Sequence, residues 1–115
     1  MNCMGYSLTS LIEQTQQLHQ VRKVDLRSGD WLFVKTRNSL YSIRVVGGGF
    51  YVVSGGWFDR KGFSPMTTTI TGCTWGGSAI KLDIVGACGL QLEFGNRLIT
   101  STIQKIILFP CGCLN

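Results

Sequence analysis

The chain has 115 residues, of which 44% are hydrophobic and 15% are charged, and its formal net charge is +5. This length suits one domain with a modest core, and the low charged fraction excludes a disordered or solvating chain. The excess of 11 Lys and Arg over 6 Asp and Glu favours nucleic acid, anionic lipid or an acidic partner only weakly, because the cations form no run. We therefore expect a single domain over residues 1–115.

The five cysteines are an odd number, and no secretory signal pattern precedes them. Both features favour a reducing compartment. No stretch approaches the roughly 18 apolar residues that a membrane-spanning helix needs. We expect a cytoplasmic protein without a membrane partner.

The first predicted element is an N-terminal α-helix over residues 7–21. Ser7 or Thr9 can cap its start, and one stripe of residues recurs at helical spacing. The stripe consists of Leu8, Leu11, Ile12, Thr15 and Leu18. Such a narrow stripe suits packing over a sheet or pairing with a second copy of the chain.

From residue 30 the apolar residues alternate with polar ones, which is typical of half-buried strands. The predicted strands cover residues 31–36, 40–46, 50–53, 67–75, 78–85, 90–94, 97–100 and 103–109, with a turn at 86–89. About eight short strands separated by turns favour a mainly β fold. We predict a small antiparallel β-barrel or bent sandwich over residues 30–109.

The hairpin over residues 67–85 is expected to lie at the centre of this body. Gly76-Gly77 is typical of a two-residue turn, which places Cys73 opposite Ile80. The face expected in the core carries Thr71, Cys73, Trp75, Ile80, Leu82 and Ile84. The face expected in water carries Gly72, Thr74, Ala79, Lys81 and Asp83.

The hairpin before it supplies the first candidate site. A turn at Asn38-Ser39 places Leu32, Val34, Thr36, Tyr41, Ile43 and Val45 on the core face. The other face carries Trp31, Phe33, Lys35, Arg37, Leu40, Ser42 and Arg44. Aromatic rings interleaved with cations hold single-stranded nucleic acid by base stacking and phosphate pairing. The candidate nucleic-acid-binding residues are Trp31, Phe33, Lys35, Arg37 and Arg44. The alternative is that the two rings pack beneath the N-terminal helix.

The loop over residues 54–65 supplies a second candidate. Trp57, Phe58 and Arg60 are of the types that anchor protein interfaces. The alternative is that the two aromatic rings fold back and close one end of the barrel.

The sequence contains no recognisable motif for metal binding or catalysis. Cys111 and Cys113 are one residue apart in the tail 110–115, and with Cys3 they lack the spacing and second ligand pair of a zinc site. His19 is the single histidine, and no nucleophile elbow or phosphate loop occurs. We expect no metal, no cofactor and no enzymatic activity.

Three runs carry a family likeness: KTRNSLYSIRV, GCTWGGSAIK and LITSTIQKI. Together they resemble a group of small uncharacterised bacterial proteins over residues 29–109. The resemblance implies no activity or ligand. The likeness of the expected shape to SH3-like and OB-like barrels is an analogy at fold level only.

These observations predict a non-enzymatic binding or protein-interaction module that self-associates into a homo-oligomer through the helix or a strand edge. One alternative is single-stranded nucleic-acid binding through the aromatic and basic face. The other is a small-molecule-binding β-barrel with a pocket near Trp57 and Trp75.

Overall fold

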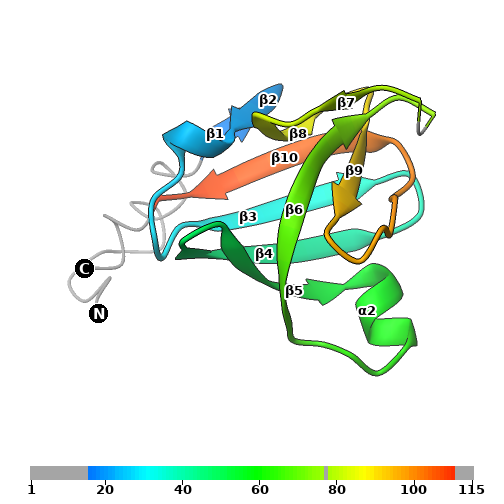
Figure 1. Cartoon of the computed structure of the whole chain (residues 1–115), viewed down its shortest axis with the longest axis horizontal. Coiled ribbons are helices and arrows are strands. Elements are labelled where there is room, and N and C mark those ends of the chain that lie inside the picture. Colours follow the sequence, from blue (N-terminus) through cyan, green and yellow to red (C-terminus); the bar gives the residue numbers. More distant parts are fainter. Residues whose placement is uncertain (1–15, 77, 111–115) are drawn as a thin grey trace.

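The computed structural model describes residues 16–76 and 78–110. This part of the chain is mainly β and antiparallel, and its main sheet curls into a half-barrel (Figure 1). The predicted mainly β antiparallel class is therefore confirmed. The strands are β1 (Gln16–Leu18), β2 (Gln20–Arg22), β3 (Trp31–Thr36), β4 (Leu40–Gly47), β5 (Phe50–Gly55), β6 (Met66–Thr74), β7 (Ile80–Lys81), β8 (Ile84–Ala87), β9 (Gln91–Phe94) and β10 (Ile103–Phe109). A 3-10 turn, η1 (Lys23–Asp25), follows β2, and a short helix, α2 (Gly56–Arg60), follows β5.

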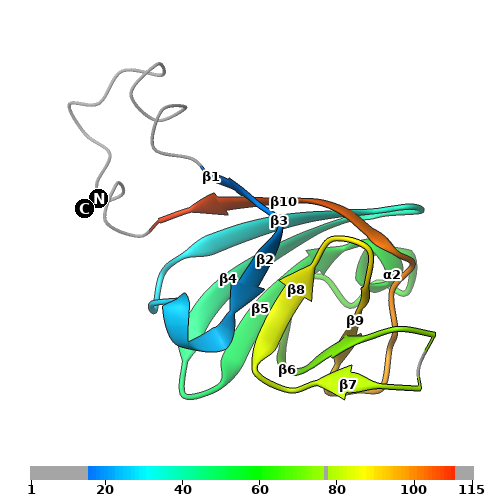
Figure 2. The same ribbon diagram turned by 90° about the horizontal axis from the view of Figure 1, so that it is seen from above.

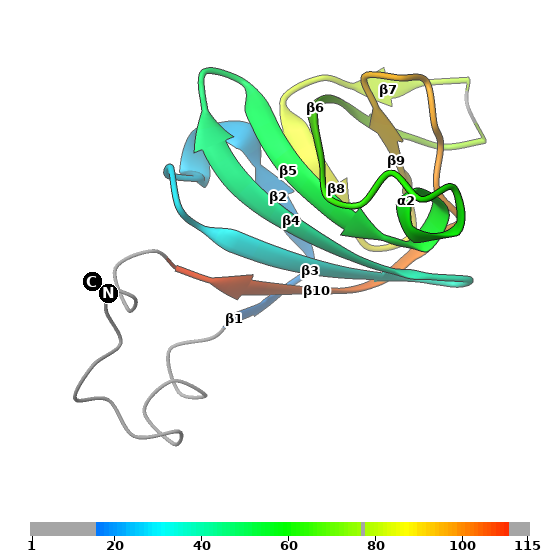
Figure 3. The ribbon, with the colours of Figure 1, turned by 90° about the horizontal axis from the view of Figure 1, so that it is seen from below.

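The main sheet has the order β1-β10-β3-β4-β5-β6-β7, and β9 pairs with β6. Strand β6 bends the sheet, because residues 66–69 pair with β5 while residues 70–74 pair with β9. The small β2–β8 sheet lies across the opening of the curl (Figures 2 and 3). The core fills the space between these layers, and α2 lies at one end of it.

The β3–β4 hairpin has the predicted faces but a different turn. The Thr36 amide donates to the Ser39 carbonyl at 2.8 Å, so the two turn residues are Arg37 and Asn38 rather than Asn38 and Ser39. The pairing has moved by two residues, and a shift of two keeps every side chain on its face. All six residues expected in the core are buried: Leu32, Val34, Thr36, Tyr41, Ile43 and Val45.

The β6–β7 hairpin reverses the chain as predicted, but its register is different. Thr74 pairs with Ile80, and the Trp75 amide donates to the Ala79 carbonyl at 3.3 Å. The expected pairing of Cys73 with Ile80 was therefore wrong by one residue, which changes the face of each side chain in one strand. Gly77 lies outside the described residues.

This register corrects the predicted core face. Cys73 and Ile84 are buried as expected, but Trp75, Ile80 and Leu82 are 75%, 41% and 63% exposed. Strand β7 has only two residues and is the last strand of the described sheet, and Trp75 and Leu82 lie just outside the β6–β7 ladder. Thr74, expected in water, is buried, whereas Lys81 and Asp83 are exposed as predicted.

The predicted N-terminal helix was wrong over residues 16–21, and its remaining residues, 7–15, lie outside the described part. Residues 16–18 form β1 against β10, and residues 20–22 form β2 against β8. Leu18 faces Ile106, and Val21 is buried beside Gly86. Strand partners distant in the sequence have thus prevailed over a local helical pattern.

Five other predictions concern residues 50–53 and 86–109. Strands over residues 50–53, 90–94 and 103–109 are confirmed as β5, β9 and β10. The predicted strand at 97–100 is reduced to one bridge between Glu93 and Ile99. Gly86, expected in a turn, lies in β8, where a Cβ atom would come within 3.3 Å of the Ile106 Cδ1 atom. Tight packing thus accounts for this glycine better than a turn does.

Thr74 supplies a stability prediction. Its hydroxyl is buried and has no hydrogen-bond partner in the described part of the chain. Leaving such a group unsatisfied costs about 1–3 kcal/mol. We expect Thr74→Val, which keeps the shape and removes the hydroxyl, to raise the free energy of unfolding by about 1 kcal/mol in urea titrations. An unchanged or lower value would show that the hydroxyl is satisfied in solution.

Cys73 supplies a pH prediction. Burial raises the pKa of this thiol from 9.0 to about 11. The stability that goes with the raised pKa is fully present below pH 9 and is lost as the pH rises to about 11, because only the unfolded chain ionises easily there. We expect the free energy of unfolding to fall by about 2–3 kcal/mol over this window. Cys73→Ala should remove this part of the pH slope, and an unchanged slope would contradict the assignment.

Candidate nucleic-acid interface

The side of the half-barrel sheet opposite the core carries side chains in rows that the strand register defines. We call this surface the outer face. The first row is Phe109, Trp31, Arg44 and Val52; the second is Ile107, Phe33, Ser42 and Ser54; the third is Lys105, Lys35 and Leu40. Neighbouring rows are two residues apart along each strand, which is roughly 6–7 Å. The outer face therefore forms a regular grid across β10, β3, β4 and β5.

Three aromatic rings make up one end of this grid. The rings of Trp31 and Phe33 are stacked with centroids 6.2 Å apart at 13°, and Phe109 meets Phe33 edge-on at 5.6 Å. Each ring is partly exposed. The contacts between the rings restrict their side-chain conformations. A ligand that binds to their exposed surface therefore costs little further side-chain entropy.

The charge on the outer face has one sign. Lys35 and Lys105 are register partners and both are exposed, while Arg44 lies opposite Trp31 in the first row. Strands β3, β4, β5 and β10 contain no Asp or Glu. Like charges directly opposite each other destabilise a sheet. An anion bound between Lys35 and Lys105 offsets this repulsion, so their placement favours an anion site.

Among residues 16–76 and 78–110, no carboxylate forms an ion pair with these cations. The ion pair in this part of the chain joins Arg22 and Asp25, at 3.2 Å. The Lys35 ammonium instead donates to the Thr36 carbonyl at 3.0 Å, which leaves two of its three donors for other groups.

The structure brings together four of the five predicted residues: Trp31, Phe33, Lys35 and Arg44. Arg37 occupies the β3–β4 turn beside them, where its amide donates to the Thr102 carbonyl at 2.8 Å. Sequence reasoning missed Phe109 and Lys105 of β10. Their alternation with Ile107 along a predicted strand was a visible signal, but the pairing of β10 with β3 was not.

The second predicted group, Trp57, Phe58 and Arg60, lies on α2. Phe58 is fully buried, with its ring centroid 5.1 Å from that of Phe94 and 6.2 Å from that of Tyr41. Trp57 is partly buried against the same cluster. This placement favours the interpretation in which the rings close one end of the barrel. Arg60 is exposed and donates to the Ser39 hydroxyl at 3.3 Å.

The local chain explains how these rings reach the core. Gly55 and Gly56 have φ of 99° and 46°, and a Cβ atom on Gly56 would collide with the Tyr41 ring. The Gly55 amide donates to the Asp59 carboxylate at 3.1 Å. The sharp turn after β5 directs α2 back toward the core beside Tyr41.

The remaining predicted chemistry can be placed only in part. Cys3, Cys111 and Cys113 lie outside the described residues, while Cys73 and Cys88 are free thiols. Among the residues that the structure describes, no group of three His, Cys, Asp or Glu side chains could hold a metal ion. Trp75 is exposed at a hairpin tip, so it lines no enclosed pocket with Trp57.

Comparison with family models, with curated proteins and with solved structures gives no match. In the described part of the chain, no helix has the length and apolar character to cross a membrane.

Proposed function

We propose that the protein is a non-enzymatic binding module that holds single-stranded nucleic acid on its outer face. The observation that carries the proposal is the pairing of Lys35 with Lys105 beside the rings of Trp31 and Phe33, on strands without a carboxylate. Rings stack on bases of any sequence, and the cations pair with phosphates. The expected ligand is a short single strand bound without strong sequence preference.

Tryptophan fluorescence tests the proposal directly. We expect an unlabelled oligothymidylate to quench the emission of Trp31 at low salt, and added salt to reverse the quenching because phosphate contacts are screened. Trp57→Phe and Trp75→Phe together leave Trp31 as the single reporter among three tryptophans. Emission that stays flat at low salt would rule out this function.

A second candidate is self-association through the β6–β7 hairpin. Trp75, Ile80 and Leu82 are all exposed there, and β7 is an edge strand of the main sheet. Exposed Trp is typical of interface anchors, and a second copy presents the same apolar side chains.

Sedimentation separates the two candidates. Self-association predicts a concentration-dependent dimer that Trp75→Ser converts to monomer without changing oligonucleotide binding. A strictly monomeric species at high protein concentration would exclude the hairpin contact and leave the nucleic-acid proposal intact.

A further inference from the structure

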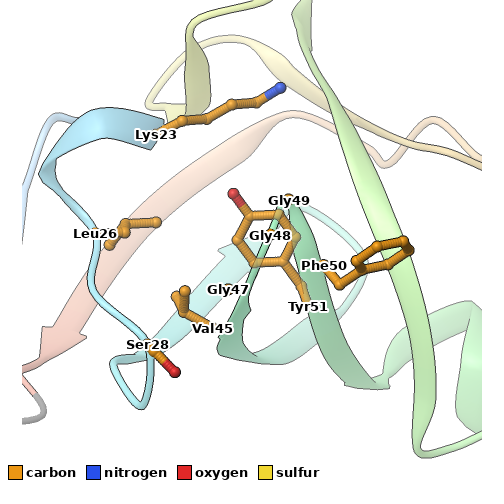
Figure 4. Close-up of a pocket in the computed structure, with 9 residues that line it drawn as sticks. All are labelled: Lys23, Leu26, Ser28, Val45, Gly47, Gly48, Gly49, Phe50 and Tyr51. Carbon is orange, nitrogen blue, oxygen red and sulfur yellow. The ribbon is translucent and has the colours of Figure 1, made fainter.

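A pocket of about 240 Å3 opens away from the outer face, between η1 and the β4–β5 turn (Figure 4). Its lining residues are Lys23, Leu26, Ser28, Val45, Gly47, Gly48, Gly49, Phe50 and Tyr51. Drug-sized ligands occupy pockets of about 300–1,000 Å3, so this pocket suits a smaller molecule.

Tyr51 contributes a phenol hydroxyl to the pocket. The residue is only 5% exposed. Figure 4 shows the hydroxyl directed into the pocket toward the side that Lys23 covers. Burial raises the pKa of Tyr51, so the hydroxyl keeps its proton at neutral pH and can donate it to a ligand oxygen.

Lys23 gives the pocket its charge. It is the single charged residue among the nine that line the pocket. Its ammonium donates to the Thr71 carbonyl at 3.3 Å, which holds the side chain across β6 and leaves two donors. An anionic group on the ligand therefore meets one cation and no carboxylate.

The walls are preformed, and part of their surface is apolar. Leu26, Val45 and Phe50 supply apolar surface, and Gly48 and Gly49 expose bare backbone in a turn with φ of 65° and 86°. The two walls are tied together, because the Gly29 amide donates to the Val45 carbonyl at 2.7 Å and the Ser28 hydroxyl to the Val46 carbonyl at 2.7 Å. A ligand would bind without reordering the chain.

We propose that this pocket binds a small organic acid with one carboxylate and a compact apolar body. The carboxylate accepts a hydrogen bond from the Tyr51 hydroxyl and pairs with the Lys23 ammonium. The apolar body lies against Leu26, Val45 and Phe50. This site is separate from the outer face and does not depend on nucleic-acid binding.

Benzoate is the probe, and the amide signals of Gly47, Gly48 and Gly49 in nitrogen–proton correlation spectra are the readout. We expect saturable shifts of these signals with benzoate and much weaker binding of benzamide, which has the same shape without the charge. Tyr51→Phe and Lys23→Met should each weaken benzoate binding by roughly tenfold. Lys61→Met removes an exposed lysine elsewhere and should leave binding unchanged.

Three results would overturn the proposal: no saturable shift at the three glycines, equal binding of benzamide and benzoate, or unweakened benzoate binding in Lys23→Met. If Tyr51→Phe fails to fold, Lys23→Met decides alone, because its side chain is not part of the buried core. Oligonucleotide binding by Lys23→Met should match that of the unaltered chain, so loss of one function is distinguishable from loss of the other.

Discussion

Replacing Phe58 with alanine is expected to lower the free energy of unfolding by about 3–5 kcal/mol. The side chain is fully buried, and its ring contacts Tyr41, Trp57 and Phe94. Truncation removes the transfer free energy of a whole ring and leaves a cavity among aromatic neighbours that cannot collapse fully. Urea titrations followed by circular dichroism measure the change.

Phe63→Ala is the matched control. Phe63 also contacts Trp57, with centroids 5.6 Å apart, but it is 50% exposed. Its truncation should cost about 1 kcal/mol or less, since much of its surface already faces water. If Phe58→Ala lowered the free energy of unfolding no more than Phe63→Ala does, the Phe58 ring would not be part of the core in solution. Phe58 would then again be a candidate interface residue.

Neutralising the outer face should weaken binding of the oligonucleotide without harming the fold. We expect Lys35→Gln, Arg44→Gln and Lys105→Gln together to make the slope of log affinity against log salt shallower by about 2, because each phosphate contact on a single strand contributes about 0.7. Removing the Lys35–Lys105 repulsion should keep or raise the free energy of unfolding. Fluorescence titrations at several salt concentrations measure the slope.

A second triple variant separates local contacts from net charge. Lys61→Gln, Lys81→Gln and Arg97→Gln remove the same three charges from exposed residues outside the outer face. This variant should keep a salt slope close to that of the unaltered chain. Equal salt slopes for both variants would show that the oligonucleotide is attracted by the net charge of the protein. The outer face would then not be its binding site.

The faces of β3 and β4 could be predicted from the sequence because period-two alternation is a local property. The turn was predicted at Asn38-Ser39, whereas the structure has it at Arg37-Asn38. This error left the predicted faces of both strands unchanged, because it moved the pairing by an even number of residues. The odd shift in the β6–β7 hairpin had the opposite consequence. The sequence there indicated a chain reversal correctly but not which side chains it would bury.

Pairings between distant strands were beyond local reasoning. Strand β10 pairs with β3, with Phe109 opposite Trp31, and no local pattern predicts which strands meet. The same limit explains the error at residues 16–21, which hydrogen-bond to β10 and β8 near the other end of the chain. The part of the outer face that lies on the β3–β4 hairpin was therefore predicted, whereas the part on β10 was not.

The position of β10 between β1 and β3 has a consequence for synthesis on the ribosome. The edge of β3 has no partner on that side until Ile103–Phe109 has left the exit tunnel, because its neighbour β10 follows all the other described strands in the sequence. An open strand with Trp31 and Phe33 is a target for aggregation during that interval. The sheet can close only after β10 has emerged, and pairing between strands so distant in the sequence makes this step slow.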